Sequence, residues 1–381
     1  MRSRTTTALA TLAALATLTG AAQAEIRLGA SVSATGPAAF LGDPEAKTIE
    51  MMVEQINASG GINGEEIALT LYDDGGDPNK ARTFATRLVE DDEVVAIIGG
   101  STTGTTMSIL SVAEAEGIPF ISLAGAISII DPVREYVFKT PHTDRMACEK
   151  IFADMAAQDI TRIGMISGTD GFGASMQAQC KEVAGAQGIE ILADETYGPQ
   201  DADMTPQLTR IRNTEGVQAV LNPGFGQGPA IVTRNVAQLG FEIPLYQSHG
   251  VASDAFIELA GAEAAEGVRL PGTALLIADL LAEDDPQYQV VTDYTAAYRE
   301  AYGTATSTFG GYAHDAVALI VDAVTRAGST DPDDIRDALE TTEGLVGTTG
   351  TYTFSAEDHL GLDLSAFRML EIRDGGWSAV D

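Results

Sequence analysis

The sequence has few basic residues, two cysteines and a single tryptophan. Lys and Arg number 22 against 55 Asp and Glu among 381 residues, so the formal net charge is −33. A surface this acidic repels phosphate backbones and anionic lipid headgroups, which argues against binding to nucleic acid or to a membrane surface. Cys148 and Cys180 fit no zinc spacing. A disulfide and two buried free thiols remain equally open for this pair.

Recognisable catalytic and metal-binding motifs are also missing. The sequence contains neither a G-x-S-x-G elbow nor an H-E-x-x-H pair. The acidic segment 73–77 lacks the distal glutamate of an EF-hand, so helix capping and solvation explain it better than calcium. None of the four histidines pairs with another at the spacing of metal ligands on one helix; they are His142, His249, His314 and His359. These absences favour a binding protein over an enzyme and predict neither a metal nor a cofactor.

The N-terminus has the composition of an export signal. Arg2 and Arg4 precede the short apolar stretch Ala8–Leu18, and a small-x-small sequence follows at Ala22–Ala24. This order predicts a secretory signal peptide over residues 1–24, cleaved after Ala24. No later segment approaches the ~20 apolar residues of a membrane helix. We therefore expect an exported protein without a membrane span, periplasmic if the source is a Gram-negative bacterium.

Strand and helix patterns alternate through the rest of the chain. The first expected strands are Glu25–Ser33, Ile67–Tyr72, Val94–Ile98 and Ile118–Ser122. Helical periodicity marks Leu41–Ala58 and Thr105–Glu116, and a second round of the same plan begins near Thr143. Helices are expected again at Tyr288–Tyr302, Gly311–Ala327 and Pro332–Glu340. The alternation predicts an α/β fold of two lobes, each a doubly wound parallel sheet.

In such folds ligands bind at the loops that follow the strands. The third strand runs into a glycine- and hydroxyl-rich turn that contains Ser101, Thr102 and Thr103. Thr105 stands where a phosphate-binding loop has lysine, so nucleotide binding is disfavoured. The free N–H groups and the dipole of the following helix favour a carboxylate at this turn, and ordinary capping is the alternative.

Three further loops carry candidate ligand contacts. The segment 124–126 offers backbone groups only, while Phe172 and Phe225 are aromatic residues on glycine-rich loops that can close over a ligand. The glycines around Phe172 run G-x-x-G-x-G, the reverse of the dinucleotide fingerprint. His249 follows a strand of the second round.

Several segments together resemble the periplasmic substrate-binding proteins of ABC transporters, of the branched-chain amino-acid type. The matching segments are Thr35–Pro37, Asn57–Gly64, Asp73–Pro78, Gly117–Pro119 and Ala260–Gly267. The resemblance covers almost all of residues 25–381. It implies the type I periplasmic binding fold, in which three crossovers join the two lobes. Lobe 1 is then residues 25–143 plus 272–353, and lobe 2 is residues 144–271 plus 354–381.

The resemblance also implies which residues contact the ligand. Ser101, Thr102 and Thr103 match the turn that meets the ligand carboxylate, and Phe172 takes the place of a tyrosine that closes over the ligand. The full expected set is Leu41, Ser101, Thr102, Thr103, Ala124, Gly125, Ala126, Phe172, Phe225, His249 and Phe309.

Two departures from the family pattern matter. A disulfide common in the family would use the positions of Gly76 and Thr102, so it is missing here. The acid that pairs with the ligand's α-ammonium is replaced by His249. A buried ammonium without an anion is costly. Either another acid such as Asp170 or Asp254 substitutes, or the ligand is an organic or aromatic acid without an ammonium.

The resemblance implies a monomeric solute-binding protein of an ABC importer, without catalysis. Its partners would be a small carboxylate, either an amino acid or an organic acid, and the membrane subunits of a permease. Two alternatives belong to other classes: a ligand sensor for a receptor or kinase, and an exported α/β enzyme.

Overall fold

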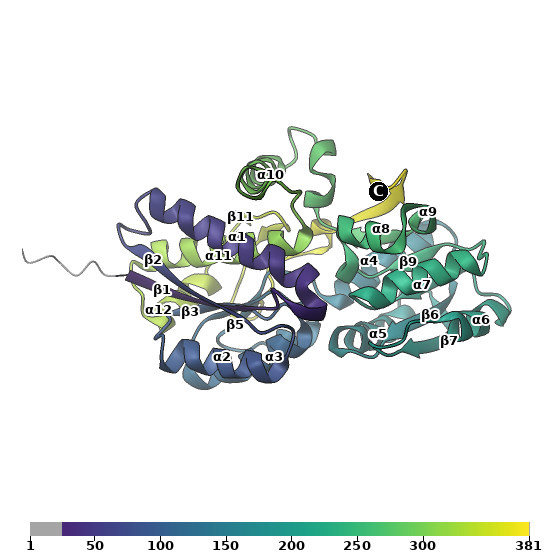
Figure 1. Cartoon of the computed structure of the whole chain (residues 1–381), viewed down its shortest axis with the longest axis horizontal. Coiled ribbons are helices and arrows are strands. Elements are labelled where there is room, and N and C mark those ends of the chain that lie inside the picture. Colours follow the sequence, from purple (N-terminus) through teal and green to yellow (C-terminus); the bar gives the residue numbers. More distant parts are fainter. Residues whose placement is uncertain (1–24, 381) are drawn as a thin grey trace, which may run out of the picture.

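Two sheets, each covered by helices, form two lobes that lie side by side in the computed structural model (Figure 1), which describes residues 25–380. The first sheet is entirely parallel, with strand order β2-β1-β3-β4-β5. Its strands are β1 (Glu25–Val32), β2 (Glu66–Asp73), β3 (Ala96–Gly99), β4 (Phe120–Ser122) and β5 (Val137–Lys139). The signal-peptide prediction concerns residues 1–24, which lie outside the described residues.

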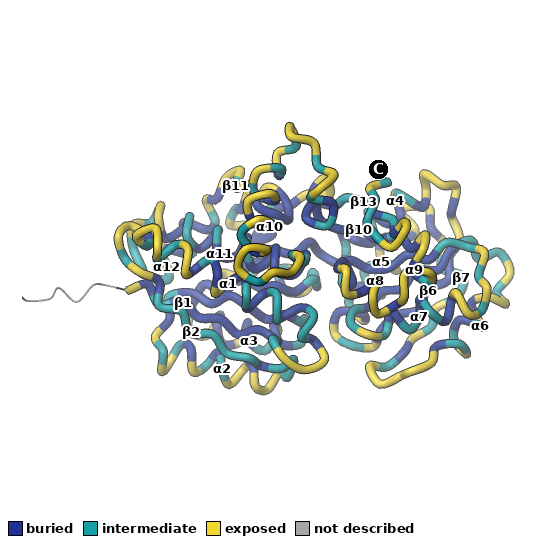
Figure 2. The backbone as a smooth tube through the Cα atoms, turned by 45° about the horizontal axis from the view of Figure 1, so that its top comes forward, coloured by how far each residue is buried: buried dark blue, intermediate teal, exposed yellow. Residues whose placement is uncertain are grey.

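Alternate residues of this sheet enter two separate apolar cores. Ile98 and Ile121 face α1 (Ala39–Ala58) and α11 (Thr308–Ala327), whereas Ile97 and Phe120 face the opposite core. The helices of the opposite core are α2 (Pro78–Glu90) and α3 (Thr103–Glu116). Both faces are thus buried, as expected for a parallel sheet, and Figure 2 shows the strands as the buried centre of the lobe.

The second sheet has seven strands in the order β14-β13-β10-β9-β8-β6-β7. Strands β6 to β10 are parallel, but β13 and β14 run antiparallel at one edge. The strands are β6 (Arg162–Gly168), β7 (Glu190–Tyr197), β8 (Ala219–Asn222), β9 (Leu245–Gln247), β10 (Arg269–Gly272), β13 (Arg368–Arg373) and β14 (Gly376–Ala379). Its helices are α4 (Asp144–Ala157), α5 (Gly171–Ala184), α6 (Thr205–Asn213), α7 (Gln227–Gln238), α8 (Asp254–Ala260) and α9 (Ala262–Ala265).

The chain passes between the lobes three times: after β5, after β10 and before β13. Between the last two crossings lie α10 (Tyr288–Tyr302), α11, α12 (Pro332–Glu340) and the small hairpin of β11 (Leu345–Val346) and β12 (Thr351–Tyr352). Phe354, the first residue of the last expected lobe 2 segment, packs against Phe138 of the first sheet with ring centroids 5.4 Å apart. The third crossing therefore lies between Phe354 and Arg368, where β13 begins.

Local sequence signals account for many of these boundaries. Asp77 caps α2 by accepting a hydrogen bond from the Asn79 N–H at 2.8 Å, with Pro78 at the first helical position. Helices α10 and α12 have the bounds that their periodicity predicts. None of the helices within residues 25–380 is both long and apolar enough to cross a membrane.

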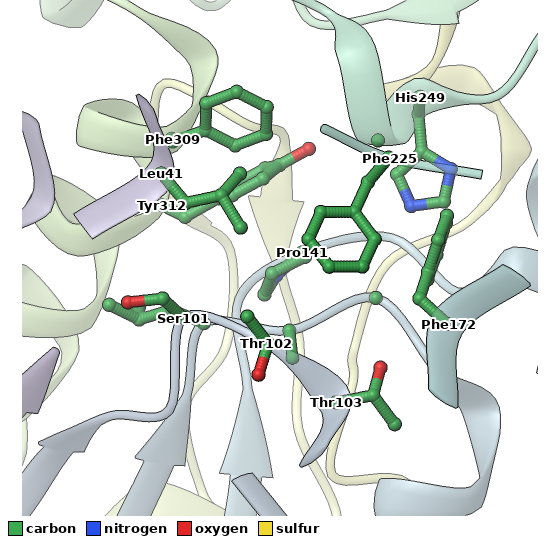
Figure 3. Close-up of a pocket in the computed structure, with 14 residues that line it drawn as sticks. Leu41, Ser101, Thr102, Thr103, Pro141, Phe172, Phe225, His249, Phe309 and Tyr312 are labelled. Carbon is green, nitrogen blue, oxygen red and sulfur yellow. The ribbon is translucent and has the colours of Figure 1, made fainter. Parts of the chain in front are cut away.

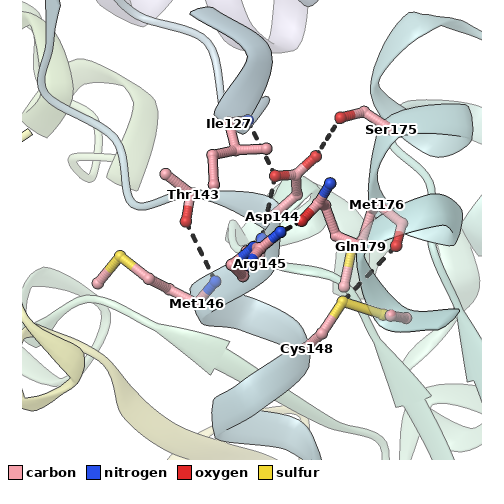
Figure 4. Close-up of a disulfide and its surroundings, with 10 residues drawn as sticks. Ile127, Thr143, Asp144, Arg145, Met146, Cys148, Ser175, Met176 and Gln179 are labelled. Atoms are coloured by element: carbon pink, nitrogen blue, oxygen red, sulfur yellow. Dashed lines mark hydrogen bonds between the residues drawn. A yellow bond between two sulfur atoms is a disulfide. The ribbon is translucent and has the colours of Figure 1, made fainter. Parts of the chain in front are cut away.

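The two cysteines form a disulfide inside lobe 2 (Figure 4). Cys148 of α4 is bonded to Cys180 of α5, so the bridge joins two neighbouring helices. Both residues are fully buried. The structure thereby decides between the bridge and the two free thiols that the sequence left open.

Candidate functional site

A narrow cavity lies where the two lobes meet (Figure 3). The cavity has a volume of only about 40 Å³. The walls are therefore close together. The lining residues are Leu41, Ser101, Thr102, Thr103, Leu123, Ala124, Gly125, Pro141, Phe172, Phe225, His249, Gly250, Phe309 and Tyr312.

The hydroxyl-rich part of the wall from lobe 1 is the turn between β3 and α3. Gly99 has φ +148°, and a Cβ there would lie 2.0 Å from the Ser31 carbonyl oxygen, so only glycine lets the strand end this way. Thr102 caps α3 and forms a reciprocal capping box with Thr105. Thr103 is the first helical residue, and its buried Oγ1 has no hydrogen-bond partner among the described residues. Capping thus occupies Thr102, while Thr103 has a free hydroxyl at the helix N-terminus.

The wall from lobe 2 is aromatic. Phe172 lies in the first turn of α5 and makes edge contacts with two rings: Phe225 at 6.3 Å and His249 at 5.3 Å between centroids. These three residues follow three different strands, β6, β8 and β9. The carboxyl ends of neighbouring parallel strands meet at one edge of a sheet, which explains why loops so far apart in sequence form one surface.

His249 is the only titratable side chain of this aromatic wall. It lies in a short 3-10 turn, η3 (His249–Val251), directly after Ser248, whose hydroxyl accepts a hydrogen bond from the Gly250 N–H. Burial, and then the charge of Lys139, lower the pKa of His249 to about 3. Neither ring nitrogen has a partner among the described residues. A neutral imidazole with one N–H donor and one acceptor therefore faces the cavity.

The two acids considered as partners for a ligand ammonium lie elsewhere. Asp170 caps α5 by accepting hydrogen bonds from the N–H groups of Phe172 and Gly173. Asp254 accepts a hydrogen bond from Trp377 Nε1 on the lobe 2 surface. Neither lines the cavity, and none of its fourteen lining residues is an acid.

The lobes touch across the cavity. A Cβ on Gly125 of lobe 1 would lie 2.8 Å from His249 Nε2 and 2.8 Å from Phe172 Cε2 of lobe 2. The rings of Phe40 and Phe225 also approach across the boundary, with centroids 6.2 Å apart. Gly125 is therefore a point of close approach, and the molecule is in a closed arrangement.

Ten of the eleven ligand contacts expected from the sequence line this cavity. Ala126 does not: it is fully buried in the core beneath, and its carbonyl oxygen lies 3.5 Å from Lys139 Nζ. Four lining residues were missed, Leu123, Pro141, Gly250 and Tyr312. Tyr312 lies one helical turn after Phe309, so helical spacing alone indicates it.

One buried acid behind the lobe 1 wall was also missed. Glu45 of α1 is fully buried, and its Oε2 makes a short contact with Ser101 Oγ. Its Oε1 has no partner among the described residues. Burial is the main cause that raises the pKa of Glu45 to about 8, and the charge of Asp74 adds to it.

Within residues 25–380 no three or more His, Cys, Asp or Glu side chains are grouped so that they could hold a metal ion. The polar groups of the cavity are hydroxyls, backbone N–H groups at a helix N-terminus and one neutral imidazole. These groups suit a small ligand that has an anionic end and an apolar or aromatic remainder.

Comparison with known proteins agrees with this architecture. The chain is 27% identical over 331 residues to the leucine-, isoleucine-, valine-, threonine- and alanine-binding protein of Pseudomonas aeruginosa, covering 84% of this chain and 85% of the relative. A Leu/Ile/Val-binding protein homologue of Brucella melitensis is 26% identical, covering 88% of each chain. The crystal structure of an extracellular ligand-binding receptor from Rhodopseudomonas palustris superposes with a TM-score of 0.87, at 29% identity, over 94% of this chain and 100% of that one.

The sequence profile of one family covers nearly all of the described chain. It is the periplasmic binding protein profile, and it matches residues 25–376. The strand orders, the three crossings and the cavity between the lobes are those of the type I periplasmic binding fold. The chain therefore belongs to the periplasmic binding protein family.

Proposed function

We propose that this protein is the solute-binding component of an ABC importer, which captures a small carboxylate between its lobes and delivers it to a permease. The observation that carries the proposal is the cavity between the lobes, with hydroxyls at a helix N-terminus on one wall and aromatic rings on the other. The relatives named as amino-acid-binding proteins support the transport role. The expected export signal at residues 1–24 and the match to the periplasmic binding protein family support a periplasmic location.

The carboxylate binds to the lobe 1 wall. The first N–H groups of α3 have no partners within the helix, and the helix dipole favours an anion there. Thr103 adds a hydroxyl that is buried and unpartnered. A hydrogen bond to a charged group contributes about 1.5–3 kcal/mol, so these donors can hold the ligand without a cationic side chain.

The rest of the ligand faces lobe 2 and lacks an α-ammonium. A buried ammonium needs an anionic partner, and the cavity lining offers none. His249 is uncharged and can share a hydrogen bond with a ligand oxygen, while Phe172 and Phe225 cover an apolar or aromatic group. Branched-chain 2-oxo acids and aromatic acids fit this description better than branched-chain amino acids.

A thermal-shift screen tests the proposal, because a ligand that binds the folded state raises the melting temperature by mass action. The panel comprises leucine, isoleucine, valine, their 2-oxo acids, benzoate and phenylacetate. We expect the acids without an ammonium to give the larger shifts. A panel without any shift contradicts the proposal of a small carboxylate, and shifts from the amino acids alone contradict the ligand class.

A further inference from the structure

The hydroxyl of Ser101 already has two partners inside lobe 1. Its Oγ accepts a hydrogen bond from the Ser33 N–H at 2.8 Å and makes a short contact with Glu45 Oε2. A hydroxyl has one proton to donate and two lone pairs to accept with. Whether Ser101 can donate a hydrogen bond into the cavity therefore depends on whether Glu45 carries a proton.

The two protonation states of Glu45 give opposite results. An ionised Glu45 can only accept, so it takes the hydroxyl proton of Ser101 and leaves no donor for the cavity. A protonated Glu45 donates to Ser101 Oγ, which then has both lone pairs occupied and its own proton free. Because Ser101 lines the cavity, that proton is available to a ligand carboxylate.

The surroundings of Glu45 favour the protonated state. Asp74, which follows β2, is held by the hydroxyls of Ser31 and Ser33 and by the Gly76 N–H. Burial raises the pKa of Asp74, and these three donors oppose that rise by stabilising its ionised form. The negative charge of an ionised Asp74 opposes a second charge on Glu45 and so raises the pKa of Glu45.

The remaining charged or titratable groups near Glu45 do not neutralise it. On α11, Tyr312 is fully enclosed, and its own pKa is raised by burial and by the charges of Asp315 and Glu45. On α1 itself, Lys47 is paired with Asp43 at 2.7 Å. Ser101 and Asp74 are the groups that shift the pKa of Glu45 besides its burial.

We propose that Glu45 is a positioning residue that must carry a proton for Ser101 to donate to the ligand carboxylate, so that the anion binds together with a proton on Glu45. This inference rests on the proposed function, because it requires a carboxylate at the lobe 1 wall. It adds a role for an acid that lines no part of the cavity. It also makes carboxylate affinity fall with rising pH.

Calorimetry with 4-methyl-2-oxopentanoate tests the inference, since the only titratable group of this probe, its carboxyl, stays ionised near neutral pH. Binding is measured at about pH 6 and about pH 9 for the wild type, Glu45→Gln and Glu50→Gln. The glutamine amide is a donor at every pH, and Glu50 is an exposed residue of the same helix that serves as the matched control. With the pKa of Glu45 near 8, only about one molecule in ten is protonated at the higher pH.

We expect the wild type and Glu50→Gln to lose about tenfold more affinity between the two pH values than Glu45→Gln does. The comparison with Glu45→Gln is needed because Lys139, whose pKa burial lowers to about 7, titrates in the same range. Equal losses in wild type and Glu45→Gln overturn the inference and leave the proposed function standing. A wild type that binds the probe at neither pH contradicts both.

An infrared difference spectrum between ligand-free wild type and Glu45→Gln at neutral pH gives a second, independent readout. We expect the variant to lose the absorption of a protonated carboxyl group. Loss of a carboxylate absorption instead would show that Glu45 is ionised, which also overturns the inference.

Discussion

The two walls of the cavity are built in different ways. The hydroxyl-rich part of the lobe 1 wall is one continuous turn, Ser101–Thr103, whose groups are fixed by the α3 capping box and by the contact with Glu45. The lobe 2 wall comes from three separate loops and has one polar side chain, His249. A continuous turn at a helix N-terminus suits a constant feature of the ligand, which in the proposed function is its carboxylate. Separate loops can vary independently, so we propose that the lobe 2 wall selects the remainder of the ligand.

The largest expected effect concerns the support of the lobe 2 wall. The disulfide holds α5, whose first turn carries Phe172, against α4. Closing a loop with a sequence separation of 32 stabilises a protein by about 3–4 kcal/mol in the chain-entropy account. We expect Cys148→Ser with Cys180→Ser to lower the free energy of unfolding by that amount in urea titrations.

Wild type treated with a reductant that opens the bridge should match the double variant. If the double variant lowers the free energy of unfolding by less than about 1 kcal/mol, helix packing alone holds the lobe 2 wall in place.

Exchanging the polar group of the lobe 2 wall should reverse ligand preference. His249→Glu supplies an anion for an ammonium and repels a second carboxylate or an oxo group. We expect leucine affinity to rise and 2-oxo acid affinity to fall, each by about tenfold or more in calorimetry. His249→Gln is the matched control, because a neutral amide should keep the order of the wild type. An unchanged order in His249→Glu would show that this side chain does not face the ligand.

Removing a hydroxyl from the lobe 1 wall should weaken every carboxylate alike. Thr103→Val keeps the side-chain shape and removes one hydrogen bond to a charged group, so affinities should fall about tenfold for all acids that bind. Thr83→Val, on the exposed side of α2, should leave them unchanged. A loss confined to one ligand would place the carboxylate somewhere other than the α3 N-terminus.

The smallest effect expected is an absence of pH dependence. Burial keeps the pKa of His249 near 3, so the ring gains its proton only well below neutral pH. The ratio of 2-oxo acid affinities between wild type and His249→Gln should stay constant from about pH 5 to about pH 8. A ring with its ordinary pKa would become cationic below about pH 6.5 and attract the anion. A ratio that rises in this direction would contradict the neutral imidazole.

Much of the first lobe follows from local sequence patterns. The Asp77–Pro78 pair predicts the start of α2, and the hydroxyl-rich turn correctly marks the start of α3. Strand β5 was missed because its three residues end in Lys139, a charged side chain whose burial the sequence does not indicate. With β5 unseen, Pro141 just after it had no reason to be assigned to the cavity.

Other features of the site could not be predicted because they depend on burial, which is set by distant parts of the chain. Leu41, Glu45 and Ile49 recur every four residues and so share one face of α1, which was a signal that Glu45 is buried. Its contact with Ser101, 56 positions later, is not visible in the sequence. Ala126 was expected in the cavity from its place in the loop after a strand and from the resemblance. Its place below the cavity is set by the 3-10 turn η2 (Ile127–Ile129), which it caps.

The central claim is that a carboxylate without an α-ammonium fits between these two walls. The most direct test is calorimetric titration of the wild-type protein with leucine and with 4-methyl-2-oxopentanoate, which share one carbon skeleton. The account predicts that the 2-oxo acid binds more tightly, because no acid lines the cavity to pair with the ammonium of leucine. Tight binding of leucine with no binding of the 2-oxo acid would contradict it.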